Sequence, residues 1–254
     1  GAGPVGLKAA EALAQRGCRV ALVEMESQVL PRLVDAQAAA MLGDELKKWG
    51  INVYCNAAPV GIVGHQGQVR ALALADGREL PTQTVLFAIG VTPRTEFLKD
   101  AGLAAPGGIR VDARLNTGQP DIFAAGDCVQ GVNLLTGQPA YVPIWPAAVE
   151  QGKIAGANMA GGNRRYPGAL PQNSISLRVF KIITGGLVHP EATDAEIVSE
   201  LDRTRGQYRR LVYREGRLVG LTLVGAVADA GIYFQLMAQQ LPAPEPVTPG
   251  RLWG

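Results

Sequence analysis

The sequence lacks a strong charge imbalance, and this excludes several classes of function. The chain has 254 residues, a net charge of +2 at pH 7 and only 18% charged residues. Binding to nucleic acid or to an anionic membrane surface relies on concentrated positive charge, so we expect neither partner. No apolar run approaches the ~18 residues that predict a membrane-spanning helix.

Cysteine and histidine are also scarce. The three cysteines, Cys18, Cys55 and Cys128, are far apart and form no Cys-x-x-Cys pair, and the only histidines are His65 and His189. This spacing predicts neither a disulfide framework nor a zinc site. It favours a cytoplasmic protein with reduced thiols and no metal.

Glycine, by contrast, is abundant, with 32 residues. The chain opens with GAGPVG, which fits the pattern G-x-G-x-x-G. In that pattern Gly1 makes the turn, Gly3 lets the backbone approach a pyrophosphate, and Gly6 lets a helix pack closely on a strand. A helical pattern follows and ends at Gly17, so the amides at the start of this helix are available to phosphates. A plain structural turn is the alternative.

An acidic residue strengthens the nucleotide hypothesis. Glu24 directly follows the apolar run 20–23 and lies 18 residues after Gly6, where a carboxylate can accept hydrogen bonds from a ribose. The same carboxylate repels the extra phosphate of NADPH, so NADH is preferred. A helix capped by Asp35 and a strand over 51–54 come next. This alternation predicts a doubly wound α/β fold.

The remaining segments are predicted from apolar runs and turn residues. The pair Asp76-Gly77 indicates a tight turn between antiparallel strands. We expect a buried strand over 84–90 and a strand over 120–127 that runs into a glycine turn. A helix over 146–162 begins with proline and ends with glycine, and a last helix is expected over 229–240. Further strands are expected over 176–183, 196–202, 207–214 and 217–224.

The order of these motifs, with VLFAIGVTPRT followed by TGQPDIFAAGD, resembles the pyridine nucleotide-disulfide oxidoreductase superfamily, flavoproteins whose FAD-binding domain is interrupted by an NAD-binding domain. The chain is most similar to the group of NADH oxidases, rubredoxin and ferredoxin reductases, and the flavin part of nitrite reductases. The resemblance implies FAD and NAD(H) as cofactors and hydride transfer from NADH to FAD. Electrons would then pass to a carrier such as rubredoxin or ferredoxin, or to a small oxidant, and a homodimer is an expected assembly.

The resemblance also implies site residues. A carboxylate at Asp127 would accept hydroxyl donors of the flavin's ribityl chain or pyrophosphate end, although Asp127 can instead cap a turn. The helix start near Ala147 would point at the flavin pyrimidine ring. Lys8 stands where the family commonly has glutamate, and it is either a functional residue or a solvated helix residue. No catalytic residue is assigned. The predicted cofactor-binding residues are Gly1, Gly3, Pro4, Val5, Gly6, Glu24, Ala88, Gly90, Gly126, Asp127, Ala147 and Ala148.

Three domains are expected from this comparison: an NAD-binding domain over 1–90 without its first strand, the C-terminal portion of an FAD-binding domain over 91–162, and a smaller mixed β/α interface domain over 163–254. The chain then corresponds to the C-terminal part of a longer flavoprotein. With a single glycine turn, assigned to NAD, we expect the chain alone not to retain FAD.

Two other functions and one surface remain open at this point. The chain is alternatively a nucleotide-binding or interaction module without turnover, or part of a disulfide reductase whose cysteines precede it. The arginines of segment 203–214 could attract an acidic carrier, or they could form a solvated strand face.

Overall fold

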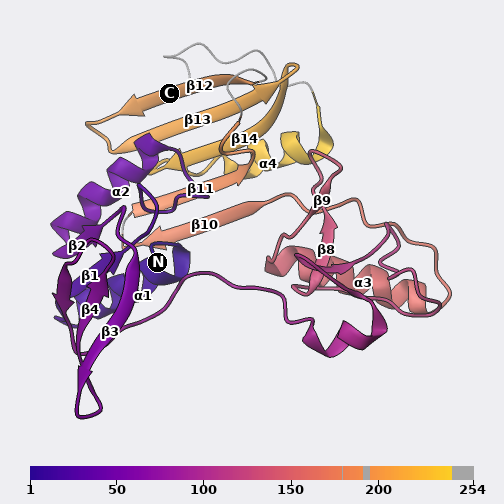
Figure 1. Ribbon diagram of the computed structural model, residues 1–254. Coiled ribbons are helices and arrows are strands. Elements are labelled where there is room, and N and C mark those ends of the chain that lie inside the picture. The colour runs from indigo at the N-terminus through magenta and orange to yellow at the C-terminus, as the bar shows by residue number, and fades with distance from the viewer. Residues whose placement is uncertain (179, 191–194, 242–254) are drawn as a thin grey trace. The chain divides into compact units, whose positions relative to one another are not determined.

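The computed structural model describes residues 1–178, 180–190 and 195–241 (Figure 1). The contacts divide the chain into two compact units. The first unit holds Gly1–Gly90 and Asn173–Tyr233, and the second holds Val91–Gln172 and the described residues from Phe234 onward. Each unit is described by itself.

The first unit begins with the predicted α/β alternation. Helix α1 (Pro4–Gln15) has proline in its first turn, and helix α2 (Ala36–Lys48) is capped by Asp35, whose side chain accepts from two amides of the first turn. Strands β1 (Val20–Val23) and β2 (Ile51–Tyr54) pair in parallel. The local signals therefore predicted these four elements correctly, because caps and apolar periodicity act within a few residues.

A small antiparallel sheet follows in the same unit. It contains β3 (Pro59–His65), β4 (Gln68–Leu74) and β5 (Glu79–Pro81), in that order. The turn between β4 and β5 contains Gly77 at a φ of 87°, a left-handed conformation that glycine adopts without steric cost. The predicted antiparallel insertion is confirmed.

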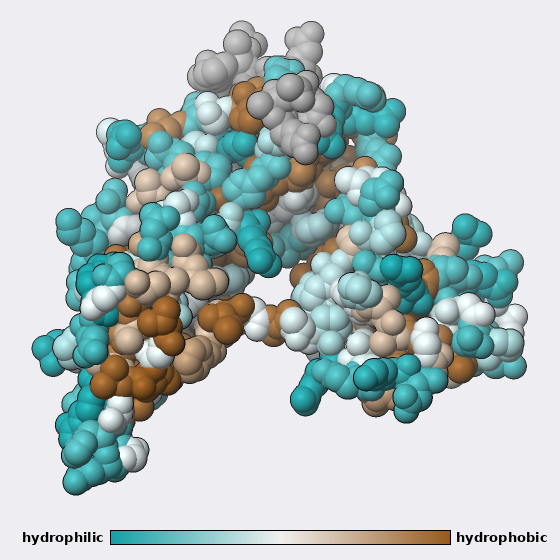
Figure 2. Space-filling view, in the orientation of Figure 1, coloured by the Kyte–Doolittle hydropathy of each residue, from teal (hydrophilic) through white to brown (hydrophobic). Residues whose placement is uncertain are grey.

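The strand expected over 84–90 is wrong, because this segment is part of none of the sheets in the described residues. A strand needs a hydrogen-bonded neighbour, and among the described strands β1 pairs only with β2. Large apolar side chains of the segment stay exposed: Leu86 by 58%, Phe87 by 61% and Ile89 by 78%. Figure 2 shows apolar surface on the unit that carries β1 and β3.

The first unit also contains a five-stranded antiparallel sheet, which we call the C-terminal sheet. Its strands are β10 (Gln172–Leu177), β11 (Phe180–Gly186), β12 (Glu196–Asp202), β13 (Gln207–Arg214) and β14 (Arg217–Val224), in the order β10-β11-β14-β13-β12. The single strand expected over 176–183 is instead the end of β10 and the start of β11, because Arg178 takes a left-handed φ of 48°. Helix α4 spans Ala230–Gln239.

One core joins the C-terminal sheet to the α/β part. Leu42 and Leu46 of α2 are buried in the same cluster as Ile182 of β11, Tyr208 of β13 and Val224 of β14. Burial of such side chains stabilises the folded state by roughly 1.5–3 kcal/mol each. The sheet therefore supports α2 directly.

The second unit contains short elements around helix α3 (Trp145–Met159). Its sheet has the order β6 (Ala104–Ala105), β7 (Gly108–Arg110), β8 (Val129–Val132) and β9 (Pro139–Ala140), and a 3-10 helix spans Glu96–Ala101. The predicted helix over 146–162 is confirmed within three residues at its end, where α3 stops at Met159.

The strand expected over 120–127 is also wrong. The segment has only an isolated bridge between Asn116 and Phe123, and regular pairing starts later, at β8. Asp121 and Gly126 take left-handed φ angles of 61° and 91°, which interrupt an extended strand at both ends. The predicted glycine turn is present at Gly126, although only an isolated bridge precedes it.

None of the helices in the described part of the chain combines the length and the apolar character that crossing a bilayer requires.

Candidate functional site

The glycine turn at the start of the chain is tightly packed on one side and open on the other. A Cβ at Gly1 would overlap the carbonyl oxygen of Ala88, and a Cβ at Gly6 would overlap the carbonyl oxygen of Gly1. These contacts leave no room for a side chain. At Gly3, in contrast, no heavy atom of the described residues lies within 4 Å of such a Cβ. The open side is where a ligand can approach the backbone.

The start of α1 adds polar groups to this open side. Gly3 caps the helix without any side-chain hydrogen bond, Pro4 occupies the first turn, and Val5 is exposed. The first amides of a helix have no acceptor within the helix, and the helix dipole makes this end positive. The turn is therefore suited to an anion such as a diphosphate.

Glu24 lies next to the turn. Its carboxylate accepts a hydrogen bond from the amide of Ala2 at 2.7 Å and one from the amide of Glu26 at 3.1 Å. The carbonyl of Ala2 accepts from the amide of Leu30 at 3.0 Å. The peptide groups of Ala2 are thus held at both ends by the segment that follows β1, and an acidic group stands at the rim of the turn.

Ala88 is beside the turn, whereas Gly90 has open space where a side chain would be. The Ala88 carbonyl faces Gly1, and the Ala88 methyl would lie 3.5 Å from a Cβ at Gly6. Gly90 has a φ of 107°, and a Cβ there would meet no heavy atom of the described residues within 4 Å. The structure thus brings together Gly1, Gly3, Gly6, Glu24 and Ala88.

The second unit has its own glycine turn, formed by Gly126 and Asp127. A Cβ at Gly126 would lie 4.0 Å from the methyl of Ala148, so this turn lies beside the first turns of α3. Asp127 is exposed. Burial raises the pKa of the Tyr141 hydroxyl, and the nearby charge of Asp127 raises it further. The charge of Asp127 therefore acts on the Tyr141 hydroxyl.

The start of α3 has the character of an anion-binding helix end. Ile144 caps it without a side-chain hydrogen bond, and Trp145 is exposed. Ala147 is buried in the core with Leu115 and Ile154, so it offers only backbone to a ligand, whereas Ala148 is partly exposed.

Gln151 is a site residue that the sequence did not indicate. It is buried, and its Oε1 accepts a hydrogen bond from the amide of Gly126 at 2.8 Å. Gly131 leaves room for it, since a Cβ there would lie 3.3 Å from Nε2 of Gln151 and 3.5 Å from the ring of Tyr166. A glutamine in a helix carries no local signal, because only the fold brings it to a turn 25 residues away.

Lys8 is held by two acceptors. Its ammonium donates to the carboxylate of Glu11 at 2.5 Å and to the carbonyl of Ser176 at 2.8 Å. Lys8 therefore joins α1 to β10, although its side chain remains about half exposed.

The prediction that the arginines of segment 203–214 face solvent or a carrier protein is wrong for two of them. Arg209 and Arg210 are buried. Arg209 forms an ion pair at 2.7 Å with Glu200, its partner across the β12–β13 pair, and Arg210 donates to the carbonyl of Val188 at 2.7 Å. These two side chains serve the packing of the sheet.

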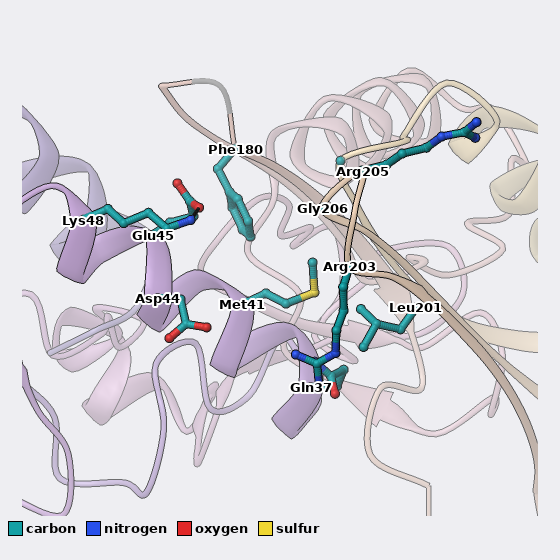
Figure 3. Close-up of a pocket in the computed structure, with 11 residues that line it drawn as sticks. Gln37, Met41, Asp44, Glu45, Lys48, Phe180, Leu201, Arg203, Arg205 and Gly206 are labelled. Carbon is teal, nitrogen blue, oxygen red and sulfur yellow. Dashed lines mark hydrogen bonds and ion pairs between the residues drawn. The ribbon is translucent and has the colours of Figure 1, made fainter.

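A separate hollow of about 340 Å³ lies between α2 and the C-terminal sheet (Figure 3). Met41 and Phe180 point into it, and charged groups form its rim. None of the predicted site residues lines it. Its lining residues are Gln37, Met41, Asp44, Glu45, Lys48, Phe180, Leu201, Arg203, Arg205, Gly206 and Gly225.

A parallel strand pair flanked by helices, with a glycine turn at the start of the first helix and an acidic residue at the next strand end, is the arrangement of dinucleotide-binding α/β proteins. Comparison with known families agrees. Residues 1–152 match the family model described as pyridine nucleotide-disulphide oxidoreductase, and the chain belongs to this family. The family consists of enzymes that use FAD and NAD(H).

Relatives and solved structures support the same assignment. An NADH oxidase of Methanocaldococcus jannaschii is 33% identical over 225 residues, which are 88% of this chain and 50% of that protein. A FAD-dependent oxidoreductase of this family from Desulfovibrio vulgaris is 31% identical with a TM-score of 0.84, covering 95% of this chain and 64% of that one. A ferredoxin reductase from Rhodopseudomonas palustris is 26% identical with a TM-score of 0.86, covering 96% and 59%. The chain spans about half the length of the curated relatives it matches. The predicted family resemblance and α/β fold class are confirmed.

Proposed function

We propose that the protein transfers a hydride from NADH to FAD and passes the electrons to a carrier protein or a small oxidant. This chain supplies the site for NADH and one side of the flavin site. The observation that carries the proposal is the glycine turn of the first unit, which is open at Gly3 and has the Glu24 carboxylate 2.7 Å from the amide of Ala2.

The turn fits the diphosphate of NADH in shape and charge. The absence of side chains at Gly1 and Gly6 brings the start of α1 against the backbone of Ala88, and the open face at Gly3 lets the diphosphate reach the backbone. The uncapped amides of α1 then donate to its oxygens. Glu24 remains at the rim to accept hydroxyl donors of the ribose.

The acidic rim favours NADH over NADPH. Glu24 and Glu26 are adjacent in space, since the Glu24 carboxylate accepts from the Glu26 amide. No arginine occurs between Glu24 and Arg32 in the sequence. A 2′-phosphate placed against this carboxylate would be repelled, and no nearby guanidinium in that segment would offset the repulsion.

The second unit fits one side of the flavin. When bound, the flavin supplies the hydride acceptor and the route for electrons. Asp127 is exposed and can accept hydroxyl donors, Gly126 allows close approach, and the uncapped start of α3 favours negative charge. Ala147 and Ala148 contribute through the backbone and a small surface.

The relatives indicate a general class of electron acceptor. One solved structure of similar fold is a ferredoxin reductase, which supports an electron carrier as partner. The three domain ranges, the homodimer, the cytoplasmic location and the disulfide-reductase alternative stay predictions.

A titration with NADH and NADPH tests the nucleotide site. We expect the chain to bind NADH at least about tenfold more tightly than NADPH, as measured by the fluorescence of the reduced nicotinamide. Glu24→Gln keeps an acceptor for the Ala2 amide but removes the charge, so it should narrow this preference. Glu79→Gln, which changes an exposed carboxylate on β5, is the matched control. Equal binding of both nucleotides would overturn the preference for NADH. Binding of neither would overturn the proposed nucleotide site.

A further inference from the structure

One segment connects the glycine turn to the C-terminal sheet. Residues 24–35 follow β1, and we call them the connecting segment. On one side they hold Ala2, which is fully buried: Glu24 accepts from its amide at 2.7 Å, and the amide of Leu30 donates to its carbonyl at 3.0 Å. The orientation of the glycine turn therefore depends on the position of the connecting segment.

On the other side the same segment is held by the sheet. The hydroxyl of Thr184 on β11 donates to the carbonyl of Leu33 at 2.7 Å, over a separation of 151 positions in the chain. The hydroxyl of Tyr208 on β13 donates to the carboxylate of Asp35 at 3.0 Å. Both donors are buried, where a hydrogen bond is costly to lose.

The two sides are connected through a compact turn. The carbonyl of Leu30 accepts from the amides of Leu33 at 2.9 Å and Val34 at 3.2 Å. Leu30 itself has a φ of 49°, an unfavourable conformation for leucine that persists only where surrounding contacts impose it. Hydrogen bonds thus join Leu33 to Leu30 and Leu30 to Ala2.

We propose that Thr184 is a positioning residue for the nucleotide site. Its hydroxyl fixes Leu33, the turn at Leu30 carries this constraint to Ala2, and the start of α1 is thereby held in the orientation that binds a diphosphate. The inference rests on the proposed function, since it names how that site is kept in shape. The C-terminal sheet is then part of the nucleotide site without touching the nucleotide.

The chain offers a matched control in Thr222. This residue on β14 lies directly opposite Thr184 in the strand register. Both threonines are 0% exposed, but the hydroxyl of Thr222 has no hydrogen-bond partner among the described residues. Replacing either by valine makes the same change in shape and burial, and only Thr184→Val removes a bond to the connecting segment.

The first arm of the test measures affinity for NADH in four forms of the chain: the parent, Thr184→Val, Thr184→Ser and Thr222→Val. We expect the Kd of Thr184→Val to rise about fivefold, while the serine variant and Thr222→Val stay within about twofold of the parent. Thr184→Val also loses the stability that this hydrogen bond contributes, so the Kd is measured at a temperature at which all four forms are folded. If Thr184→Val lowers only the melting temperature and leaves the Kd unchanged, the inference is wrong.

The second arm uses no nucleotide. Amide hydrogen exchange at Leu30, followed by NMR, should be faster in Thr184→Val and unchanged in Thr222→Val. If the parent chain does not bind NADH, the proposed function fails, and this arm decides the inference alone. Unchanged exchange at Leu30 in Thr184→Val would refute the transmission from Leu33 to the turn.

Discussion

The two glycine turns of the molecule use glycine for different physical reasons. In the first, Gly6 is required because a methyl group would overlap the carbonyl oxygen of Gly1. In the second, Gly126 has space, with the nearest atom 4.0 Å away, but its backbone has a φ of 91°. The first turn thus excludes a side chain by contact, and the second excludes it by conformation.

The two turns are also held in place by different contacts. The first is fixed by backbone packing against Ala88 and by hydrogen bonds that join Glu24 and Leu30 to Ala2. The second is held by the side chain of Gln151. Substitutions should therefore damage the first turn through overlap and the second through lost hydrogen bonding or strain.

The largest effect is expected for Gly6→Ala. Its methyl group cannot avoid a backbone atom, so the free energy of unfolding should fall by about 3 kcal/mol or more. Gly3→Ala is the control, because its methyl meets no described atom within 4 Å; it should lower NADH affinity while leaving stability nearly unchanged. Urea unfolding and NADH titration separate the two, and similar losses of stability in both would contradict the packing argument.

The next effect concerns the bond that holds the second turn. Gln151→Leu leaves the amide of Gly126 without its acceptor, which should cost about 2 kcal/mol of stability. Gln138→Leu changes an exposed glutamine of the same unit and should stay within about 0.5 kcal/mol. Denaturant unfolding measures both. If the two variants are equally stable, Gln151 does not hold the turn.

Alanine substitution should change the free energy of unfolding in opposite directions at two glycines near α3. Gly126→Ala must adopt a positive φ and should cost about 1–2 kcal/mol. Gly152→Ala lies inside α3 with open space around it, so it should stabilise the unit by about 0.5–1 kcal/mol. Thermal unfolding gives both signs, and destabilisation by Gly152→Ala would contradict the open space at that position.

The smallest effect is electrostatic. Burial raises the pKa of Tyr141, and the negative charge of Asp127 adds to this. Asp127→Asn should therefore lower the pKa of Tyr141, while burial keeps it above the ordinary tyrosine value. An NMR pH titration of the tyrosine ring carbons measures the shift. The pKa of Tyr213, which burial raises in the first unit, should not move, and a shift there instead would contradict the proximity of Asp127 and Tyr141.

The sequence predicted the elements whose signals are local. Gly17 marks the end of α1, and Asp35 marks the start of α2, because these residues act on the nearest backbone groups. The G-x-G-x-x-G pattern and Glu24 were found in the same way. The strands predicted over 84–90 and 120–127 were wrong. Their apolar composition matches a strand, but pairing depends on a neighbouring strand that composition does not specify.

The site residues that the sequence did not indicate form their hydrogen bonds over long separations in the chain. Gln151 meets Gly126 over 25 positions, and Thr184 meets Leu33 over 151. Arg209 has the sequence context of a surface cation, but its position opposite Glu200 in the β12–β13 register lets it be buried as an ion pair. Such roles follow from topology, which short-range patterns do not contain.

The unpaired segment 84–90 has a consequence for handling the protein in solution. Its residues TVLFAIG include no charge and no proline, and most of its large apolar side chains are exposed. Exposed apolar segments without charge or proline are prone to associate with other chains. For this 254-residue chain on its own, self-association should therefore increase with protein concentration, and NADH titrations are best made in dilute solution.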